Sequence, residues 1–186
     1  MDKIKSDWVL VVDADERVTD ELKKEIITKI KSNESSAYNI PRKNYFLGKW
    51  IKYCGWYPDY TLRLFKNRYR YSGDVHEHLK IDEEIKSLKN PLIHYTYKNL
   101  NHYIKKINQY TTLSANEMHN SGRKTSLIYI IIRPILEFIE KAIFKKGILL
   151  GGPGILLSIL SSYYKFLKYA KLWELNNVKN RSSNDE

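Results

Sequence analysis

The sequence contains almost no cysteine, with Cys54 the single one among 186 residues. One thiol excludes a disulfide within the chain and a cysteine-rich zinc site, and it fits a reducing compartment. Acidic residues are also in deficit, with 21 Asp and Glu against 32 Lys and Arg and a formal net charge of +11. Residues 101–186 hold seven of these eleven charges. A basic region of this kind predicts an anionic partner, such as membrane lipid, nucleic acid or a phosphorylated substrate.

A secretory signal peptide is not visible either, because charged residues follow Met1 directly and an apolar run begins at Trp8. With 42% apolar and 28% charged residues, the composition is that of a globular chain, and its length predicts one domain with a sizeable core. Tyr (15) and Trp (4) are numerous, but such side chains serve sugar, nucleic-acid and membrane surfaces alike.

The apolar run 8–12 ends directly in three carboxylates, Asp13, Asp15 and Glu16. A short continuous apolar run predicts a central strand buried on both faces, with the carboxylates at its solvent end. Ligands of open α/β sheets bind at the carboxyl ends of strands, and strand alternation places Asp13 and Asp15 on one side. Two such carboxylates suit Mg²⁺ together with water and phosphate. The alternative is that they are ordinary loop residues before the next helix.

Local patterns predict further elements in the first half of the chain. Thr19 is suited to cap a helix that runs to Lys31, since acidic residues fill its first turn and apolar residues recur at helical spacing. Asp59 is predicted at the start of a strand beside an aromatic segment, residues 45–60, which is more typical of a binding surface than of core. Short strands are predicted at 38–42, 60–65 and 92–95. The first of these is expected to end at its proline, Pro41.

A dense group of titratable side chains follows at His76, Glu77 and His78, with Asp74 close by. Such groups bind metals or transfer protons. In a strand the two histidines share one face and Glu77 takes the other, and their spacing is not that of a zinc-protease helix. A polar edge strand is an equally good interpretation. His94 is most simply a structural histidine.

The second half is predicted to be helical. A helix is expected over 101–120, and a strongly apolar amphipathic helix begins near Leu127. Residues 147–164 carry no charge, but Gly151–Gly154 would break a helix there, which favours a re-entrant or interfacial hairpin over a full membrane span. The aromatic and cationic residues that follow are typical of a membrane interface. A helical pair packed as ordinary core is the alternative, and residues 176–186 are expected to be disordered.

Five stretches, taken together, resemble a known family. They are DWVLVVDADE (7–16), YPDYTLRLF (57–65), VHE (75–77), GGPG (151–154) and FLKYAKLWE (166–174). In this order, over residues 5–175, they are similar to bacterial family 2 glycosyltransferases of the GT-A fold, most closely to the branch that includes lipopolysaccharide core glucosyltransferases.

The resemblance implies an α/β fold with a partial GT-A, Rossmann-like sheet. It implies that residues 1–122 form the metal and acceptor part of the catalytic domain, that 123–175 are membrane-associated helices, and that 176–186 are a disordered tail. Family members carry further residues in front, which form the first strands and the nucleotide's base and ribose pocket. This chain is expected to lack that nucleotide-binding half, as a truncated or split gene product would.

The activity implied is transfer of a hexose from a nucleotide-sugar donor to a cell-envelope glycan or glycolipid, such as lipopolysaccharide core. The enzyme is expected at the cytoplasmic face of the bacterial inner membrane, bound to anionic lipid. In the family, a divalent cation, Mg²⁺ or Mn²⁺, is held on the donor's diphosphate, and Asp13 and Asp15 match its ligands. Asp15 is the stronger candidate, and His76 matches a further ligand.

The remaining site residues serve the acceptor and the phosphates. An inverting transfer needs a carboxylate to take the proton of the acceptor hydroxyl. Asp59 matches that general base, with Glu77 as the alternative. Arg63 is expected to pair with phosphate or to hold a carboxylate, and a structural ion pair is an equally good interpretation. Trp56 and Tyr57 are expected to stack on acceptor sugar.

A rival interpretation needs no catalysis. The net charge of +11 with interleaved aromatic residues also suits a basic peripheral membrane protein or a nucleic-acid-binding protein. Against it, the carboxylates cluster at strand ends and the basic excess adjoins an apolar segment. Nucleic acid is therefore the less expected partner.

Overall fold

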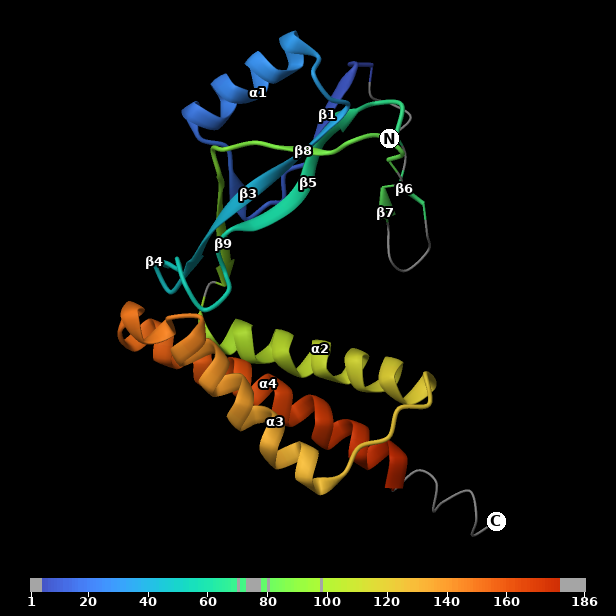
Figure 1. Ribbon diagram of the computed structural model, residues 1–186, viewed down its shortest axis with the longest axis vertical. Coiled ribbons are helices and arrows are strands. Elements are labelled where there is room, and N and C mark those ends of the chain that lie inside the picture. Colours follow the sequence, from blue (N-terminus) through green and yellow to red (C-terminus); the bar gives the residue numbers. More distant parts are fainter. Residues whose placement is uncertain (1–4, 70, 73–77, 80, 98, 178–186) are drawn as a thin grey trace. The chain divides into compact units, whose positions relative to one another are not determined.

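The computed structural model describes residues 5–69, 71–72, 78–79, 81–97 and 99–177. The chain divides into two compact units. The first consists of Met1–Tyr45 with Trp56–Thr96, and the second of Phe46–Gly55 with Tyr97–Glu186. The first is built mainly on a sheet and the second mainly on helices (Figure 1). The mixed α/β class predicted from the sequence is therefore confirmed.

The main sheet has the strand order β1-β5-β3-β9-β2, and two short strands, β4 and β8, pair with β3. β5 runs antiparallel to both β1 and β3, β2 is antiparallel to β9, and β8 is parallel to β3. The sheet is therefore mixed, and most of these strand pairs are antiparallel. The bounds are β1 Trp8–Leu10, β2 Glu16–Arg17, β3 Ala37–Phe46, β4 Lys49–Trp50, β5 Asp59–Lys66, β8 Lys86–Ser87 and β9 Leu92–Tyr97, with β6 Tyr71–Ser72 and β7 His78–Leu79 in a separate pair.

Strand β1 is covered on both faces, as its apolar run predicts. Val9 packs with Phe65 on one face, while Trp8 and Leu10 pack against the larger apolar cluster on the other. Its predicted central place is not found, because β1 pairs only with β5 among the described strands and lies at the end of the strand order.

Helix α1, Asp20–Ser32, begins where its cap predicts. The Thr19 side chain accepts a hydrogen bond from the Leu22 N–H at 3.1 Å, which satisfies one of the free donors of the first turn. Leu22 and Ile26 are buried on the sheet side of the helix. They share one apolar cluster with Tyr38, Ile40, Leu64, Leu88 and Leu92, which is the core of the first unit.

Strand β3 is longer than predicted, and Pro41 does not end it. Pro41 lies inside the strand and pairs in register with Tyr60 of β5. The prediction was wrong because proline removes one N–H but its fixed φ is compatible with extended backbone, and the pairing with β5 continues beyond it. Leu47 and Gly48, both with positive φ, form the two-residue turn into β4, so the aromatic segment is partly a hairpin.

The second unit contains, in the part described, α2 Leu100–Asn120, α3 Leu127–Ile139 and α4 Gly152–Asn177. A π-helical turn, Glu140–Phe144, and a 3₁₀ turn, Gly147–Leu150, lie between α3 and α4. α4 packs against both α2 and α3 (Figure 1). The helices predicted over 101–120 and from residue 127 are confirmed.

The glycine-rich break is also confirmed, since Gly151 has a φ of 67° and α4 begins directly after it. Pro153 lies in the first turn of α4, where its missing N–H leaves no partner unsatisfied. The helix continues to Asn177, so residues 176–177 are helical rather than disordered, and 178–186 lie outside the described residues. Within the described residues, none of the helices combines the length and apolarity needed to cross a bilayer.

Candidate functional site

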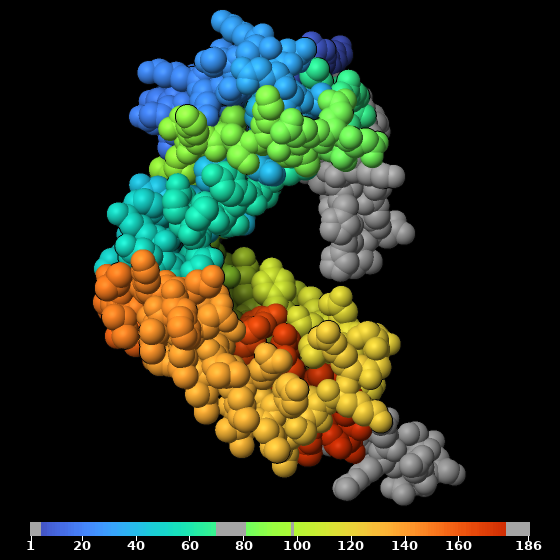
Figure 2. Space-filling model, in the orientation of Figure 1, coloured from blue at the N-terminus to red at the C-terminus, as the bar shows by residue number. Residues whose placement is uncertain are grey.

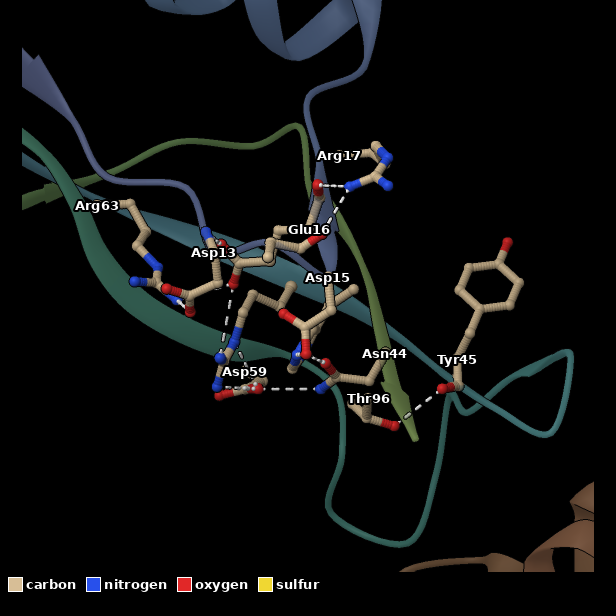
Figure 3. Close-up of polar contacts among 12 residues, drawn as sticks. Asp13, Asp15, Glu16, Arg17, Asn44, Tyr45, Asp59, Arg63 and Thr96 are labelled. Atoms are coloured by element: carbon tan, nitrogen blue, oxygen red, sulfur yellow. Dashed lines mark hydrogen bonds and ion pairs between the residues drawn. The ribbon is translucent and has the colours of Figure 1, made fainter. Parts of the chain in front are cut away.

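The segment that follows β1 is a turn, and Glu16 closes it. The Glu16 N–H donates to the Asp13 carbonyl at 2.9 Å, and Glu16 Oε2 accepts from the Asp13 N–H at 3.0 Å. Because residues 13–15 lie outside any strand, the alternation expected to place Asp13 and Asp15 on one side does not apply. Asp13 faces Arg63 of β5 (Figure 3). Asp15 instead lies beside His94 of β9.

Arg63 connects the turn to β5. Its Nη2 donates to Asp13 Oδ2 and also to Glu16 Oε1, the latter at 2.8 Å. The Glu16 side chain is fully buried, while half of the Asp13 side chain is exposed. Arg63 thus contacts two carboxylates, which agrees both with a residue that holds a carboxylate of the site and with a structural ion pair.

A second arginine, Arg42 of β3, lies on the other side of Glu16. Its Nη1 is 3.7 Å from Glu16 Oε1, and its Nη2 and Nε are 2.8 and 3.0 Å from Asp59 Oδ2. Arg42 and Asp59 are directly opposite each other in the β3–β5 register, which places their side chains within reach. Asp59 therefore starts its strand as predicted, and its main partner comes from across the sheet.

Asn44 and His94 complete the group. Asn44 Nδ2 donates to Asp59 Oδ2 at 2.9 Å and to the Trp56 carbonyl at 3.1 Å. With both amide hydrogens used, Asn44 Oδ1 accepts from His94 Nδ1 at 2.7 Å. His94 Nε2 is then 3.6 Å from Asp15 Oδ2. His94 is thus part of the site rather than only a structural histidine.

Burial and neighbouring charges set the protonation of two members. Burial alone lowers the pKa of the Arg63 guanidinium, but its hydrogen bonds and charge interactions with Asp13 and Glu16 outweigh this and raise that pKa. Burial lowers the pKa of His94, the positive charge of Arg42 adds to the effect, and the nearby carboxylates oppose it. Arg63 therefore remains a cation, and His94 favours its neutral form.

The eight side chains form one continuous polar cluster, called here the carboxylate–arginine cluster (Figure 3). With His94 neutral, four carboxylates face two guanidinium groups, which leaves two formal negative charges in a chain of net charge +11. Such a cluster attracts cations. Among the residues that the structure describes, no three His, Cys, Asp or Glu side chains gather in a way that would hold a metal ion. Its members are Asp13, Asp15, Glu16, Arg42, Asn44, Asp59, Arg63 and His94.

The structure brings together four residues predicted from the sequence, Asp13, Asp15, Asp59 and Arg63. Trp56 contributes its carbonyl to Asn44, and it and Tyr57 are half-buried before β5. The predicted residues His76 and Glu77 lie outside the described residues.

Sequence reasoning did not assign Glu16, Arg42, Asn44 or His94 to the site. The β3–β5 register is the signal that finds Arg42, because it places Arg42 directly opposite Asp59. Asn44 follows two residues later in β3, on the same face as Arg42, and also reaches Asp59.

Comparison with known proteins gives relatives that are named glycosyltransferases. The chain is 27% identical to the lipopolysaccharide core biosynthesis glycosyltransferase LpsC of Rhizobium meliloti, over 96% of this chain and 68% of that protein. It is 24% and 23% identical to uncharacterized glycosyltransferases of Rickettsia typhi and Rickettsia prowazekii, each over 92% of this chain and 63% of the relative. No family model matches, and no solved structure matches.

These relatives support a glycosyltransferase. The chain spans about two thirds of the length of the curated relatives it matches.

Proposed function

We propose that this chain is the metal- and acceptor-binding part of a family 2 glycosyltransferase of the GT-A type, which transfers a hexose from a nucleotide sugar to a cell-envelope glycan such as lipopolysaccharide core. The observation that carries the proposal is the negative carboxylate–arginine cluster, which joins Asp13, Asp15 and Asp59 in an otherwise basic protein. Glycosyltransferase relatives that align with more than nine tenths of the chain support it.

The donor atoms at the turn fit a hard divalent cation. Asp13 and Asp15 offer carboxylate oxygens, the ligands that Mg²⁺ and Mn²⁺ prefer, and Mg²⁺ commonly needs only one or two carboxylates besides water and phosphate. The Asp15 side chain is 45% exposed, and one Asp13 oxygen is already bonded to Arg63. We therefore assign Asp15 as the main ligand and Asp13 as its partner. The cation would neutralise charge on the leaving diphosphate.

Asp59 is suited to act as the general base. Arg42 and Asn44 both donate to its Oδ2, which fixes the plane of the carboxylate. Among the contacts of the described residues, Oδ1 accepts none of these bonds, so its lone pairs are available to take the proton of an acceptor hydroxyl. Trp56 and Tyr57, directly before β5, are placed to stack on the acceptor sugar.

The acceptor of such an enzyme is attached to a membrane, and the second unit has a surface for one. Helix α3 exposes a continuous apolar stripe at helical spacing, called here the α3 face, and exposed Lys145 and Lys146 follow it. Residues of this segment, yellow to orange in Figure 2, form much of the second unit's visible surface. Such a surface suits an anionic bilayer. It supports the proposal that the enzyme works at the cytoplasmic face of the inner membrane. The face comprises Leu127, Ile128, Ile131, Ile132, Ile135 and Leu136, between 47% and 65% exposed.

The metal assignment is tested by titrating the chain with Mn²⁺, with and without pyrophosphate, and following free Mn²⁺ by electron paramagnetic resonance. Asp15→Asn is expected to weaken binding at least about tenfold, since one charged ligand is lost. Asp82→Asn, an exposed residue outside the carboxylate–arginine cluster, is the matched control. Equal binding by Asp15→Asn and wild type contradicts the assignment.

The base is tested by sugar transfer from radiolabelled nucleotide hexoses to lipopolysaccharide acceptor. This and every other transfer assay uses a version of the chain with a nucleotide-binding half joined in front. Asp59→Asn is expected to abolish transfer while Mn²⁺–pyrophosphate binding stays unchanged. If Asp59→Asn transfers normally and Glu77→Gln does not, the base is Glu77. Salt-dependent RNA binding without Mn²⁺ binding would favour the non-enzymatic alternative.

A further inference from the structure

Glu16 occupies an unusual place for a carboxylate. Its side chain has no exposed surface, and an isolated buried carboxylate is strongly disfavoured. Every oxygen has a partner here. Oε1 lies 2.8 Å from Arg63 Nη2 and 3.7 Å from Arg42 Nη1, and Oε2 accepts the Asp13 N–H at 3.0 Å. Two cations on different strands therefore converge on a single buried oxygen.

Each of these arginines also holds a more exposed carboxylate. Arg63 bonds Asp13, and Arg42 bonds Asp59 through two nitrogens. The order is thus Asp13, Arg63, Glu16, Arg42, Asp59, with charges alternating in sign and the buried member in the middle. The chain of contacts joins the turn after β1 to both β5 and β3.

We propose that Glu16 is a positioning residue that fixes Asp13 and Asp59 relative to each other through Arg63 and Arg42. The inference rests on the proposed function, in which Asp13 belongs to the donor side and Asp59 takes the acceptor proton. Without the negative charge of Glu16, the two guanidinium groups face each other across a poorly solvated space and repel. Each then moves with its own aspartate, and a misplacement of about 1 Å at reacting groups costs about a hundredfold in rate.

A purely structural ion pair would stabilise the fold without linking the two aspartates. The difference is measurable in the Nε–Hε resonances of Arg42 and Arg63, recorded by ¹⁵N NMR and assigned from Arg42→Lys and Arg63→Lys. In a wild-type background, Asp13→Asn is expected to shift both resonances, although Asp13 contacts only Arg63 of the two. In a Glu16→Gln background, Asp13→Asn is expected to shift the Nε–Hε resonance of Arg63 but not that of Arg42. The proposal is overturned if Asp13→Asn leaves the Arg42 resonance unchanged in both backgrounds.

Turnover gives the second readout. Glu16→Gln and Arg42→Lys are each expected to lower kcat for sugar transfer by about a hundredfold with the donor KM unchanged. The double variant is expected to be no slower than either single variant, because each substitution breaks the same link between Asp13 and Asp59. Multiplicative losses would show two independent roles and overturn the proposal. Glu84→Gln, exposed and outside the cluster, is the control.

The two claims fail separately. If wild type neither transfers sugar nor binds Mn²⁺, the proposed function fails, while the NMR coupling still decides whether Glu16 links the two arginines. If Glu16→Gln does not fold, Arg42→Lys keeps the charge and tests the same link, since it removes the two-nitrogen contact to Asp59. In the Arg42→Lys background, Asp59→Asn is expected to leave the Nε–Hε resonance of Arg63 unchanged. A shift of that resonance overturns the proposal.

Discussion

Replacing Ile131 and Ile135 by serine tests whether the α3 face binds a bilayer. The two side chains lie one helical turn apart and are 63% and 53% exposed. Complete burial of an isoleucine side chain contributes about 1.5–3 kcal/mol. Scaled by the exposed fraction, insertion of each contributes about 1–2 kcal/mol. The double variant should therefore bind membranes about 30- to 1,000-fold more weakly than wild type.

The assay is co-sedimentation with vesicles of phosphatidylcholine, with and without phosphatidylglycerol. Wild type is expected to bind the anionic vesicles more tightly, with a preference that falls as salt rises, because Lys145 and Lys146 adjoin the face. Ile27→Ser, on α1 of the first unit and 44% exposed, is the matched control and should bind like wild type.

Two results would refute this reasoning. One is a double variant that binds vesicles as tightly as the Ile27→Ser control. The other is a wild-type protein that does not bind vesicles and sediments as a dimer, together with a double variant that sediments as a monomer. The α3 face would then be covered by a second copy of the chain.

Three further predictions concern stability and reactivity. Gly154→Ala should destabilise the second unit by about 3 kcal/mol or more in urea unfolding, because its Cβ would overlap the Gly147 carbonyl oxygen. Gly152→Ala is the control, because the space around its Cβ is open. Equal urea midpoints for the two variants would disprove the close packing at Gly154. Arg63→Met should cost about 3–5 kcal/mol by leaving buried Glu16 without its nearest cation, and a midpoint within error of wild type would contradict that. Cys54 should resist alkylation at pH 8 until the chain is unfolded, since burial raises the pKa of its thiol; rapid labelling of native protein would show otherwise.

Local features were predicted well from the sequence. The Thr19 cap and the helix break at Gly151 each depend on interactions within a few residues, so their residue types suffice to locate them. The alternating pattern of residues 60–65 located β5, which starts at Asp59. The apolar pattern of residues 127–136 likewise identified an amphipathic helix. The prediction that Pro41 ends its strand was wrong for the complementary reason, because pairing with a distant strand outweighs one local signal.

The partners within the candidate site were decided by tertiary structure. Arg42 meets Asp59 only because β3 and β5 pair in one particular register, and a shift of one residue would turn these side chains to opposite faces. Asp13 and Asp15 diverge because a turn, closed by Glu16, replaces the expected strand. The sequence by itself determined which carboxylates stand at the end of the first strand. Which arginines hold Asp13 and Glu16, and that Glu16 is buried between two of them, follow from contacts between residues 26 to 50 positions apart.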